Sequence, residues 1–225
     1  MIFRHFFTNV YGGAGNDRLN IDYSSGDNLL SGGDGNDYLS ASGTSLDYDS
    51  GAYAASGNNT LKGGGGNDSL NIDYSSGDNL LFGGDNNDLL SAIGALGNAL
   101  DGGNGNDILI GGKGNDSLYG GNGNDAFVFN SYNQGIDTIY DFNATNELIQ
   151  VLAAGFGGGL SAPSLSANQF TLGTSATTSN QRFIYNNVTG GLYFDLDGNA
   201  GGFTQVKFAQ LSSGLSLTNN NFVVV

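Results

Sequence analysis

The chain has no cysteine and, among its 225 residues, only one proline and one histidine. Without cysteine it has no disulfide framework, no thiolate metal site and no cysteine nucleophile. No apolar run approaches the ~20 residues of a membrane span. The start, MIFRHFFTNV, is too short and too interrupted by Arg4 and His5 for a secretory signal peptide.

Positive charge is also scarce, because six Lys and Arg stand against 21 Asp and Glu, giving a formal net charge of -15. Residues 1–128 hold 16 acids and four Lys or Arg, while residues 129–225 hold five and two, so their net charges are -12 and -3. The strongly acidic first part argues against nucleic acid and anionic membranes as partners, and it favours cations.

Glycine is abundant, with 40 residues, and much of it lies in a nine-residue repeat. From Gly102 to Val128 the unit occurs three times without interruption, as GGNGNDILI, GGKGNDSLY and GGNGNDAFV. The glycines form a turn that directs carbonyl oxygens toward one point, and Asp at position six adds a carboxylate there. An apolar residue at position eight belongs to a short strand. Hard oxygen ligands without His or Cys suit calcium.

The unit also occurs earlier in the chain. Residues 12–40 return at 63–91 with 24 of 29 positions identical, which indicates a duplication. Full units therefore also start at Gly12, Gly32, Gly63 and Gly83. Between them lie weaker units in which Asn takes the Asp position, and Asn keeps an acceptor oxygen but loses the charge. These weaker units contain Asn28, Asn59, Asn79 and Asn98.

The units resemble the calcium-binding nonapeptide G-G-x-G-x-D-x-U-x of the repeats-in-toxin (RTX) family of bacterial secreted proteins. The resemblance implies a parallel β-roll in which consecutive units alternate between two edges. One edge would then be rich in Asp and the other mostly neutral. The segments FVFNSYNQGIDTIYDF, NQFTLGTSATTSNQRFIYNNVTGGLYFDLDGN and FAQLSSGLSLTNNNFVVV are similar to the region that follows the repeats in this family.

We therefore expect an all-β protein, with an N-terminal stub over residues 1–11, a calcium-binding parallel β-roll over 12–128, and a β-rich C-terminal cap over 129–225. Short aromatic and β-branched runs predict the strands of the cap: FVFN, IDTIYDF, ELIQVL, RFIYN, GLYFDL and TQVKFAQL. The resemblance implies that the cap also carries an uncleaved type I secretion signal, although Asn221 stands where such signals often have an acid. Ala41–Lys62 reads as a loop that holds Asp47 and Asp49.

A ladder of apolar residues is the expected core of the roll. It comprises Leu19, Leu30, Leu39, Leu61, Leu70, Leu81, Leu90, Leu100, Leu109, Leu118 and Phe127. Burying each yields roughly 2 kcal/mol, whereas ordering a glycine-rich chain costs about 1.5 kcal/mol per residue. Stacking would also place position-six carboxylates ~4.8 Å apart, where they repel by about 3 kcal/mol at an effective dielectric near 20. We therefore expect the roll to need a cation in order to fold.

The expected carboxylate ligands are the seven position-six residues, Asp17, Asp37, Asp68, Asp88, Asp107, Asp116 and Asp125. The resemblance implies further ligands from carbonyls at positions one and three, as at Gly102, Asn104, Gly111, Lys113, Gly120 and Asn122. Asn86 replaces the fourth glycine of one unit and tolerates a left-handed backbone, so we expect that site to be kept but weakened. A turn array that needs no metal is the alternative.

The remaining motifs give weaker evidence of function. Asp195–Asn199 resembles the start of an EF-hand loop, but Val206 stands where the terminal Glu belongs, which favours a turn. His5 has no catalytic partner motif beside it. Lys113 follows two glycines without the G-K-[ST] of a phosphate-binding loop.

The expected function is calcium binding, with up to about six Ca²⁺ ions, that drives folding outside the cell after type I secretion, and no enzyme activity. Two alternatives stay open. The chain could be the C-terminal carrier of a larger secreted enzyme, favoured by its start ten residues before the first repeat. It could also be a calcium-dependent adhesin or matrix component with a glycan or surface partner, for which outward Tyr23, Tyr38, Tyr74 and Tyr119 are candidates.

Gly102–Val128 is the stretch where adjacent units on both edges carry the full motif, so we expect the roll to nucleate there and grow toward Gly12. Asp107→Ala and Asp125→Ala should each raise the calcium midpoint for folding more than Asp17→Ala does. Circular dichroism during calcium titration measures these midpoints. Equal shifts in all three variants would refute this order of folding.

Overall fold

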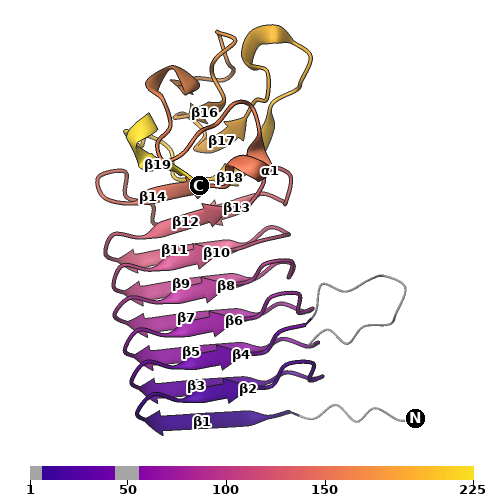
Figure 1. Cartoon of the computed structure of the whole chain (residues 1–225), viewed down its shortest axis with the longest axis vertical. Helices are drawn as coiled ribbons and strands as arrows, with labels where there is room; N and C mark the ends of the chain where they lie inside the picture. The colour runs from indigo at the N-terminus through magenta and orange to yellow at the C-terminus, as the bar shows by residue number, and fades with distance from the viewer. Residues whose placement is uncertain (1–6, 44–55) are drawn as a thin grey trace, which may run out of the picture.

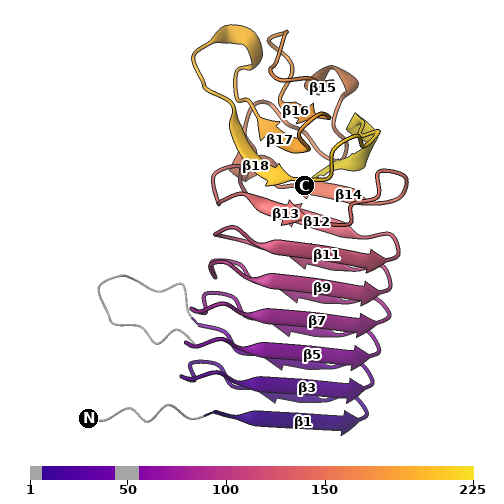
Figure 2. The ribbon, with the colours of Figure 1, turned by 180° about the vertical axis from the view of Figure 1, so that it is seen from behind.

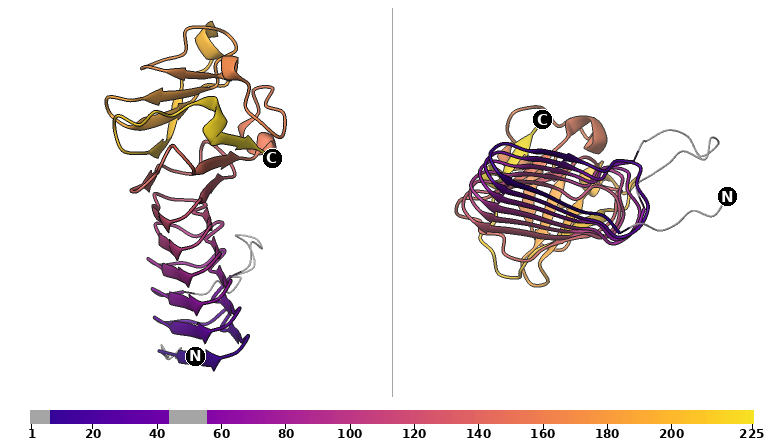
Figure 3. Two further views of the ribbon diagram at one scale, coloured as in Figure 1. Left: turned by 90° about the vertical axis from the view of Figure 1, so that its left-hand side faces the viewer. Right: turned by 90° about the horizontal axis from the view of Figure 1, so that it is seen from below.

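The computed structural model describes residues 7–43 and 56–225, and it shows a stack of chain turns that carries a cap at its C-terminal end (Figure 1). From residue 9 to residue 110, each turn of the stack contributes a six-residue strand to one sheet and a three-residue strand to the other. Seen from behind, the long strands form a regular ladder (Figure 2). Seen from below, successive turns lie almost on top of one another (Figure 3).

Two sheets run the length of the molecule. In spatial order, the strands of the first sheet are β1 (Asn9–Ala14), β3 (Leu29–Asp34), β5 (Thr60–Gly65), β7 (Leu80–Asp85), β9 (Ala99–Asn104), β11 (Ser117–Asn122), β13 (Asp137–Ile139), β18 (Val206–Gln210), β17 (Gly191–Phe194), β16 (Phe183–Asn186) and β15 (Phe170–Leu172). The strands of the second sheet are β19 (Phe222–Val224), β14 (Leu148–Val151), β12 (Ala126–Phe129), β10 (Ile108–Ile110), β8 (Leu89–Ser91), β6 (Ser69–Asn71), β4 (Tyr38–Ser40) and β2 (Arg18–Asn20). All neighbouring pairs in the stack are parallel, and β17 is antiparallel to both β16 and β18.

The register places the same repeat position of successive turns in one row. Leu61 of β5, for example, pairs with Leu30 on one side and with Leu81 on the other. Because the side chains of a strand alternate between its two faces, such a row lies either wholly inside or wholly outside the roll. All eleven residues of the predicted core ladder are buried, with exposed fractions between 0% and 5%. The predicted core is therefore confirmed.

The two glycines of each Gly-Gly pair are required for different reasons. A methyl group built on Gly63 would lie 2.5 Å from the carbonyl oxygen of Gly83 in the next turn, which is too close for any side chain. Gly64 has φ near +120°, a backbone conformation that side chains other than glycine rarely adopt. The pair thus allows both the close stacking of turns and the sharp change of direction.

The stack extends past Val128, since β13 pairs with β11 and β14 pairs with β12. The change in sequence period at Ala126 therefore does not coincide with the end of the stack. At the other end, β1 begins at Asn9, inside the segment expected as a stub, because each long strand starts three residues before its Gly-Gly pair. Asp47 and Asp49 of the expected loop lie outside the described residues.

The cap adds α1 (Ala153–Phe156) and three 3₁₀ turns, Ala167–Gln169, Gly198–Ala200 and Asn219–Asn221. Its core is aromatic: Phe183 contacts Phe156, Phe194 and Phe222 with ring centroids 4.9 to 5.6 Å apart. The six cap strands predicted from sequence correspond to β12, β13, β14, β16, β17 and β18. The all-β class and the parallel roll are confirmed. No helix in the described part of the chain has the length and apolar character needed to cross a membrane.

Leu81 and Leu80 form a matched pair for testing the core, because Leu81 is fully buried and its neighbour Leu80 is 41% exposed. Leu81→Ala should lower the free energy of unfolding by about 2–5 kcal/mol, since the tight stack leaves a cavity. Leu80→Ala should change it by less than about 1 kcal/mol. Denaturant unfolding in saturating calcium measures both, and equal losses would contradict the inside-outside assignment of the strand.

Candidate metal centre along the edges of the roll

The predicted carboxylates divide unequally between the two edges of the roll. We call the connections from long to short strands the first edge, and those from short to long strands the second edge. The first edge holds Asp17, Asp37, Asp68, Asp88, Asp107 and Asp125, while the second edge holds Asp116. All but Asp17 are at most 3% exposed. The sequence-derived division into an acidic edge and a mostly neutral edge agrees with this placement.

One oxygen of each carboxylate has a fixed role in the stacking. Along the first edge, Oδ1 of each Asp after Asp17 accepts the backbone N–H of the Asp one turn earlier. Asp68 Oδ1, for example, accepts from Asp37 at 2.7 Å, and Asp88 Oδ1 accepts from Asp68 at 2.7 Å. The same bond links Asp17 to Asp37, Asp88 to Asp107 and Asp107 to Asp125. These charge-assisted bonds orient all the carboxylates alike.

The other oxygen of every one of the seven carboxylates is buried and has no hydrogen-bond partner. A buried polar atom without a partner is costly, and a series of seven equivalent ones is an unusual pattern. The first turn shows what this atom faces. A methyl group built on Gly12 would lie 2.5 Å from Asp17 Oδ2 and 2.6 Å from the carbonyl oxygen of Gly32. Carboxylate and carbonyl oxygens of adjacent turns therefore meet beside the position-one glycine.

The same pairing recurs up the first edge. A methyl group built on Gly83, next to Asp88 Oδ2, would lie 2.5 Å from the carbonyl oxygen of Gly102. A methyl group built on Gly102, next to Asp107 Oδ2, would lie 2.7 Å from the carbonyl oxygen of Gly120. The structure thus brings the carbonyls of Gly102 and Gly120, two of the predicted position-one ligands, near unpartnered carboxylate oxygens. The full set of unpartnered oxygens is Oδ2 of Asp17, Asp37, Asp68, Asp88, Asp107, Asp116 and Asp125.

The position-three residues lie differently. The carbonyl of Asn122 accepts the N–H of Gly105 at 2.8 Å, and its side chain donates to Asn104 Oδ1 at 2.8 Å on the exposed surface. Lys113 is exposed and pairs with Leu96 in an isolated bridge. A carbonyl oxygen that accepts one hydrogen bond keeps a second lone pair. The position-three carbonyls of Asn104, Lys113 and Asn122 therefore stay predicted ligands. Asn86 has φ of 75°, which is the left-handed conformation expected for its replacement of glycine.

The donor set fits a hard cation. The first-edge positions from Asp17 to Asp107 each offer an anionic oxygen and a carbonyl oxygen, the ligand types that Ca²⁺ takes. In residues 7–43 and 56–225, no three Asp, Glu, His or Cys side chains are grouped so as to hold a metal by themselves. A metal bound along these edges would therefore depend on the backbone carbonyls as much as on the carboxylates.

Asp137 belongs to this arrangement, and sequence analysis missed it. Oδ1 of Asp137 accepts the N–H of Asp116 at 3.0 Å, so it continues the second-edge ladder by one turn. A methyl built on Gly111 would lie 2.9 Å from Asp116 Oδ2 and 3.1 Å from Asp137 Oδ2. The sequence does contain a pattern that identifies this residue, because Gly135-x-Asp-x-Ile139 repeats positions four to eight of the nonapeptide. The second edge thus ends in a pair of carboxylates.

Glu147 is the second residue that sequence analysis missed. Leu148 pairs with Ala126, which places Glu147 one turn beyond Asp125 on the first edge. Asn146 precedes it and donates to Asn124 Oδ1 at 2.7 Å, extending the row of position-five asparagines. The stretch from Asn146 to Ile149 therefore repeats the N-D-x-U part of the motif with Glu in place of Asp.

Burial without a counter-ion raises the pKa of several of these carboxyls. Burial is the main cause for Asp68 and Asp107, whose pKa values rise to about 6, and for Asp88, whose pKa rises to about 7. The negative charges of Asp107 and Asp68 raise that of Asp88 further. Burial raises the pKa of Asp137, and the adjacent Asp116 raises it further. A divalent cation would reverse these shifts.

The remaining candidate motifs are structural or lie elsewhere. Asp195 Oδ1 accepts the N–H of Asp197 at 3.3 Å, and Asp197 Oδ2 accepts that of Gly202 at 2.8 Å, so this stretch forms a turn. That agrees with the turn favoured over an EF-hand loop. His5 lies outside the described residues.

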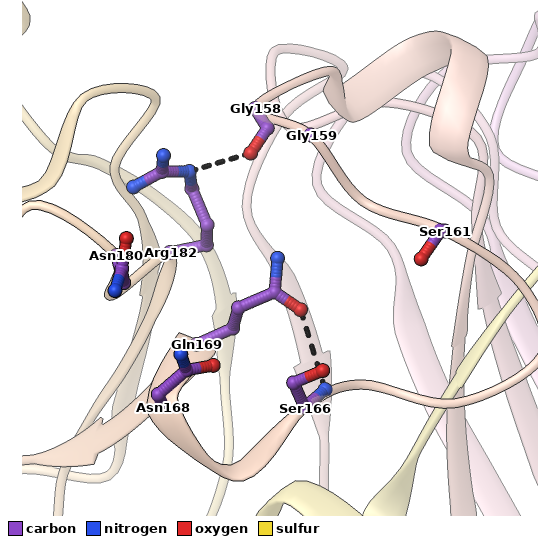
Figure 4. Close-up of a pocket in the computed structure, with 8 residues that line it drawn as sticks. All are labelled: Gly158, Gly159, Ser161, Ser166, Asn168, Gln169, Asn180 and Arg182. Atoms are coloured by element: carbon purple, nitrogen blue, oxygen red, sulfur yellow. Dashed lines mark hydrogen bonds between the residues drawn. The ribbon is translucent and has the colours of Figure 1, made fainter.

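A cavity of about 240 Å³ lies in the cap, away from both edges (Figure 4). Its one charged lining residue is Arg182, whose Nε donates to the carbonyl of Gly158 at 2.8 Å. Gln169 on the opposite wall accepts the N–H of Ser166 at 3.2 Å. The polar groups of this cavity thus mainly hold the cap loops together.

The raised pKa values predict how pH acts on the roll in the absence of calcium. Because these carboxyls titrate near pH 6 to 7 when folded and near 3.8 when unfolded, the folded chain binds more protons in between. Stability in chelator should therefore fall as pH rises from about 5 to 8. Circular dichroism at these pH values measures it, and Asp88→Asn should weaken the dependence. More β structure at pH 8 than at pH 5 would contradict this.

Comparison with known proteins gives one family and distant structural matches. No curated protein sequence gives a significant match. The AlgE6R3 subunit of a mannuronan C5-epimerase from Azotobacter vinelandii is 21% identical with a TM-score of 0.34, covering 94% of this chain and 80% of that one. The extracellular lipase LipA of Serratia marcescens is 17% identical with a TM-score of 0.29, covering 94% of this chain and 40% of that one.

The family model is that of the RTX calcium-binding nonapeptide repeat, and it matches residues 9–20, 24–43, 52–71, 75–92 and 94–130. These ranges contain all seven carboxylates with an unpartnered Oδ2. They end before Asp137 and Glu147. The chain therefore belongs to the family of RTX calcium-binding repeat proteins, and its repeats occupy residues 9–130.

Proposed function

We propose that this chain is a secreted calcium-binding protein or module whose roll folds when Ca²⁺ binds between its turns outside the cell. The ligands would be the position-six carboxylates with carbonyls of their own and neighbouring turns. The number of ions, the secretion route and the identity of each ligand belong to this proposal.

The observation that supports it most is the row of buried carboxylate oxygens without a partner. Five of these oxygens, on the first edge from Asp17 to Asp107, lie beside a backbone carbonyl oxygen of the next turn, so two partial negative charges meet there. An ionised carboxylate in that position is strongly unfavourable unless a cation lies between the oxygens. Metal binding would thereby supply folding free energy directly.

The composition supports a disordered state before the ion binds. Residues 1–128 carry a net charge of -12 and most of the 40 glycines, so chain entropy and charge repulsion both oppose folding there. A medium with about millimolar calcium, the range that extracellular modules bind, would reverse the balance. Such a chain could pass a type I secretion channel unfolded and fold on exit.

Calcium titration by calorimetry coupled to circular dichroism tests the proposal. In chelator the chain should show little β structure, and added Ca²⁺ should produce it together with the uptake of several ions. Mg²⁺ at the same concentration serves as the matched control, because it demands a smaller and stricter octahedral shell. A spectrum that is the same in chelator and in millimolar calcium would sink the proposal.

A further inference from the structure

The cavity in the cap has an unexpected lining for a chain with a net charge of -15. It lies between three segments, which are the glycine loop after α1, the chain around the 3₁₀ turn Ala167–Gln169, and the stretch that leads into β16 (Figure 4). The backbone N–H of Arg182 donates to the carbonyl of Gln169 at 2.8 Å and joins two of these segments. The lining contains one Arg and neither Asp nor Glu. The cavity therefore presents a positive charge on an otherwise acidic protein.

The hydrogen bonds of Arg182 hold its side chain in place without neutralising it. In the part of the chain that the structure describes, its guanidinium donates to three backbone carbonyls, those of Gly158 and Ser179 at 2.8 Å and that of Gln181 at 3.0 Å. These bonds use Nε and Nη1. A guanidinium has five N–H donors and stays charged in proteins. Nη2 therefore keeps two donors for a ligand of negative charge.

Several other polar side chains of the lining are unused as well. Within the described residues, the side chains of Ser161, Asn168 and Asn180 make no hydrogen bond, and Gln169 uses only its Oε1. Figure 4 shows these groups on different sides of the cavity. An amide carries donors and an acceptor, and a hydroxyl carries both. The lining thus offers donors and acceptors together, which matches a ligand with several hydroxyl groups.

Two glycines preserve the space beside the arginine. A methyl group built on Gly158 would lie 2.8 Å from Arg182 Cδ and 2.9 Å from Arg182 Nε, so a side chain there would displace the guanidinium. A methyl group built on Gly159 would have no atom within 4 Å, so this residue borders open space. The pair therefore keeps Arg182 in position and leaves room in front of it.

The size and polarity of the cavity restrict its ligand. Its volume of about 240 Å³ is below the ~300 Å³ at which pockets for drug-sized molecules begin. The lining has no apolar or aromatic side chain, so an apolar ligand would gain little there. A simple anion would leave the amide and hydroxyl acceptors unused, and a neutral sugar would leave the arginine without a counter-charge.

We propose that this cavity binds a sugar acid, through the carboxylate and the hydroxyl groups of one uronate unit. The carboxylate accepts from Nη2 of Arg182, and the hydroxyls bond to the amides of Asn168, Asn180 and Gln169. The site shares no residue with either edge of the roll, and it does not depend on the proposed function. It gives the cap a recognition role that is separate from calcium binding.

Galacturonate is the probe, added to the full chain in saturating calcium. Free calcium is held constant, because carboxylates also bind calcium. Nitrogen-15 NMR follows the Nε–H signal of Arg182 and the side-chain amides of Asn168 and Asn180. Saturable shifts are expected below about 20 mM, since a small ligand with few apolar contacts binds weakly. Galactose and acetate should each bind at least about tenfold more weakly, because each lacks part of the contacts.

The test variant is Asn168→Ala combined with Asn180→Ala, because neither side chain bonds to the rest of the described chain. Its affinity for galacturonate should fall at least about fivefold. Asn187→Ala is the matched control, since Asn187 is exposed and lies outside the cavity lining. Arg182→Gln should abolish saturable binding. Circular dichroism in saturating calcium verifies that each variant folds.

Two kinds of result would overturn the proposal. One is the absence of a saturable shift, or equal affinity for galacturonate and for acetate or galactose. The other is equal affinity of the double asparagine variant and the control. Trigalacturonate then distinguishes the source of the ligand. Tighter binding than that of the monomer supports a uronate residue of a polysaccharide, and equal or weaker binding supports a free sugar acid.

Discussion

A buried carboxylate oxygen with no proton donor recurs in every full repeat, and the rest of the roll depends on it. Glycine at position one makes it possible, because a side chain there would occupy the space between Asp17 Oδ2 and the carbonyl of Gly32. The absence of a side chain that permits close stacking therefore also creates the oxygen-lined gap. A stack of such turns is tightly packed and electrostatically unfavourable until positive charge enters it.

The two edges solve this problem in different ways. On the second edge, Asn28 Nδ2 donates to Asn59 Oδ1 at 2.8 Å, and Asn59 Nδ2 donates to Asn79 Oδ1 at 3.0 Å. An amide carries both a donor and an acceptor, so the asparagine ladder satisfies itself without an ion. A carboxylate carries acceptors only, so the Asp ladder cannot satisfy its own oxygens in this way. One edge is thus closed by the chain's own hydrogen bonds, and the other leaves room for a cation.

The cap provides what the roll lacks. Its core consists of large aromatic side chains, among them Phe156, Phe183 and Phe208, which bury far more apolar area per residue than the single leucine of each half-turn. It also ends both ladders with acids: Asp137 follows Asp116 on the second edge, and Glu147 follows Asp125 on the first. The aromatic core and the acids that end both ladders therefore lie at the same end of the stack.

The sequence by itself determined the repeat, the core ladder from Leu19 to Phe127, the parallel roll and the seven Asp positions, because each follows from a local nine-residue period. The positions of Asp137, Asp141 and Glu147 against the last repeats were decided only by the tertiary structure. Their partners Asp116, Gly120 and Asp125 lie about 20 residues earlier in the chain, inside the uninterrupted repeat, and the period is broken after them. Strand register therefore brings these residues together. A local pattern specifies what each turn contains, whereas stacking specifies which oxygen atoms meet.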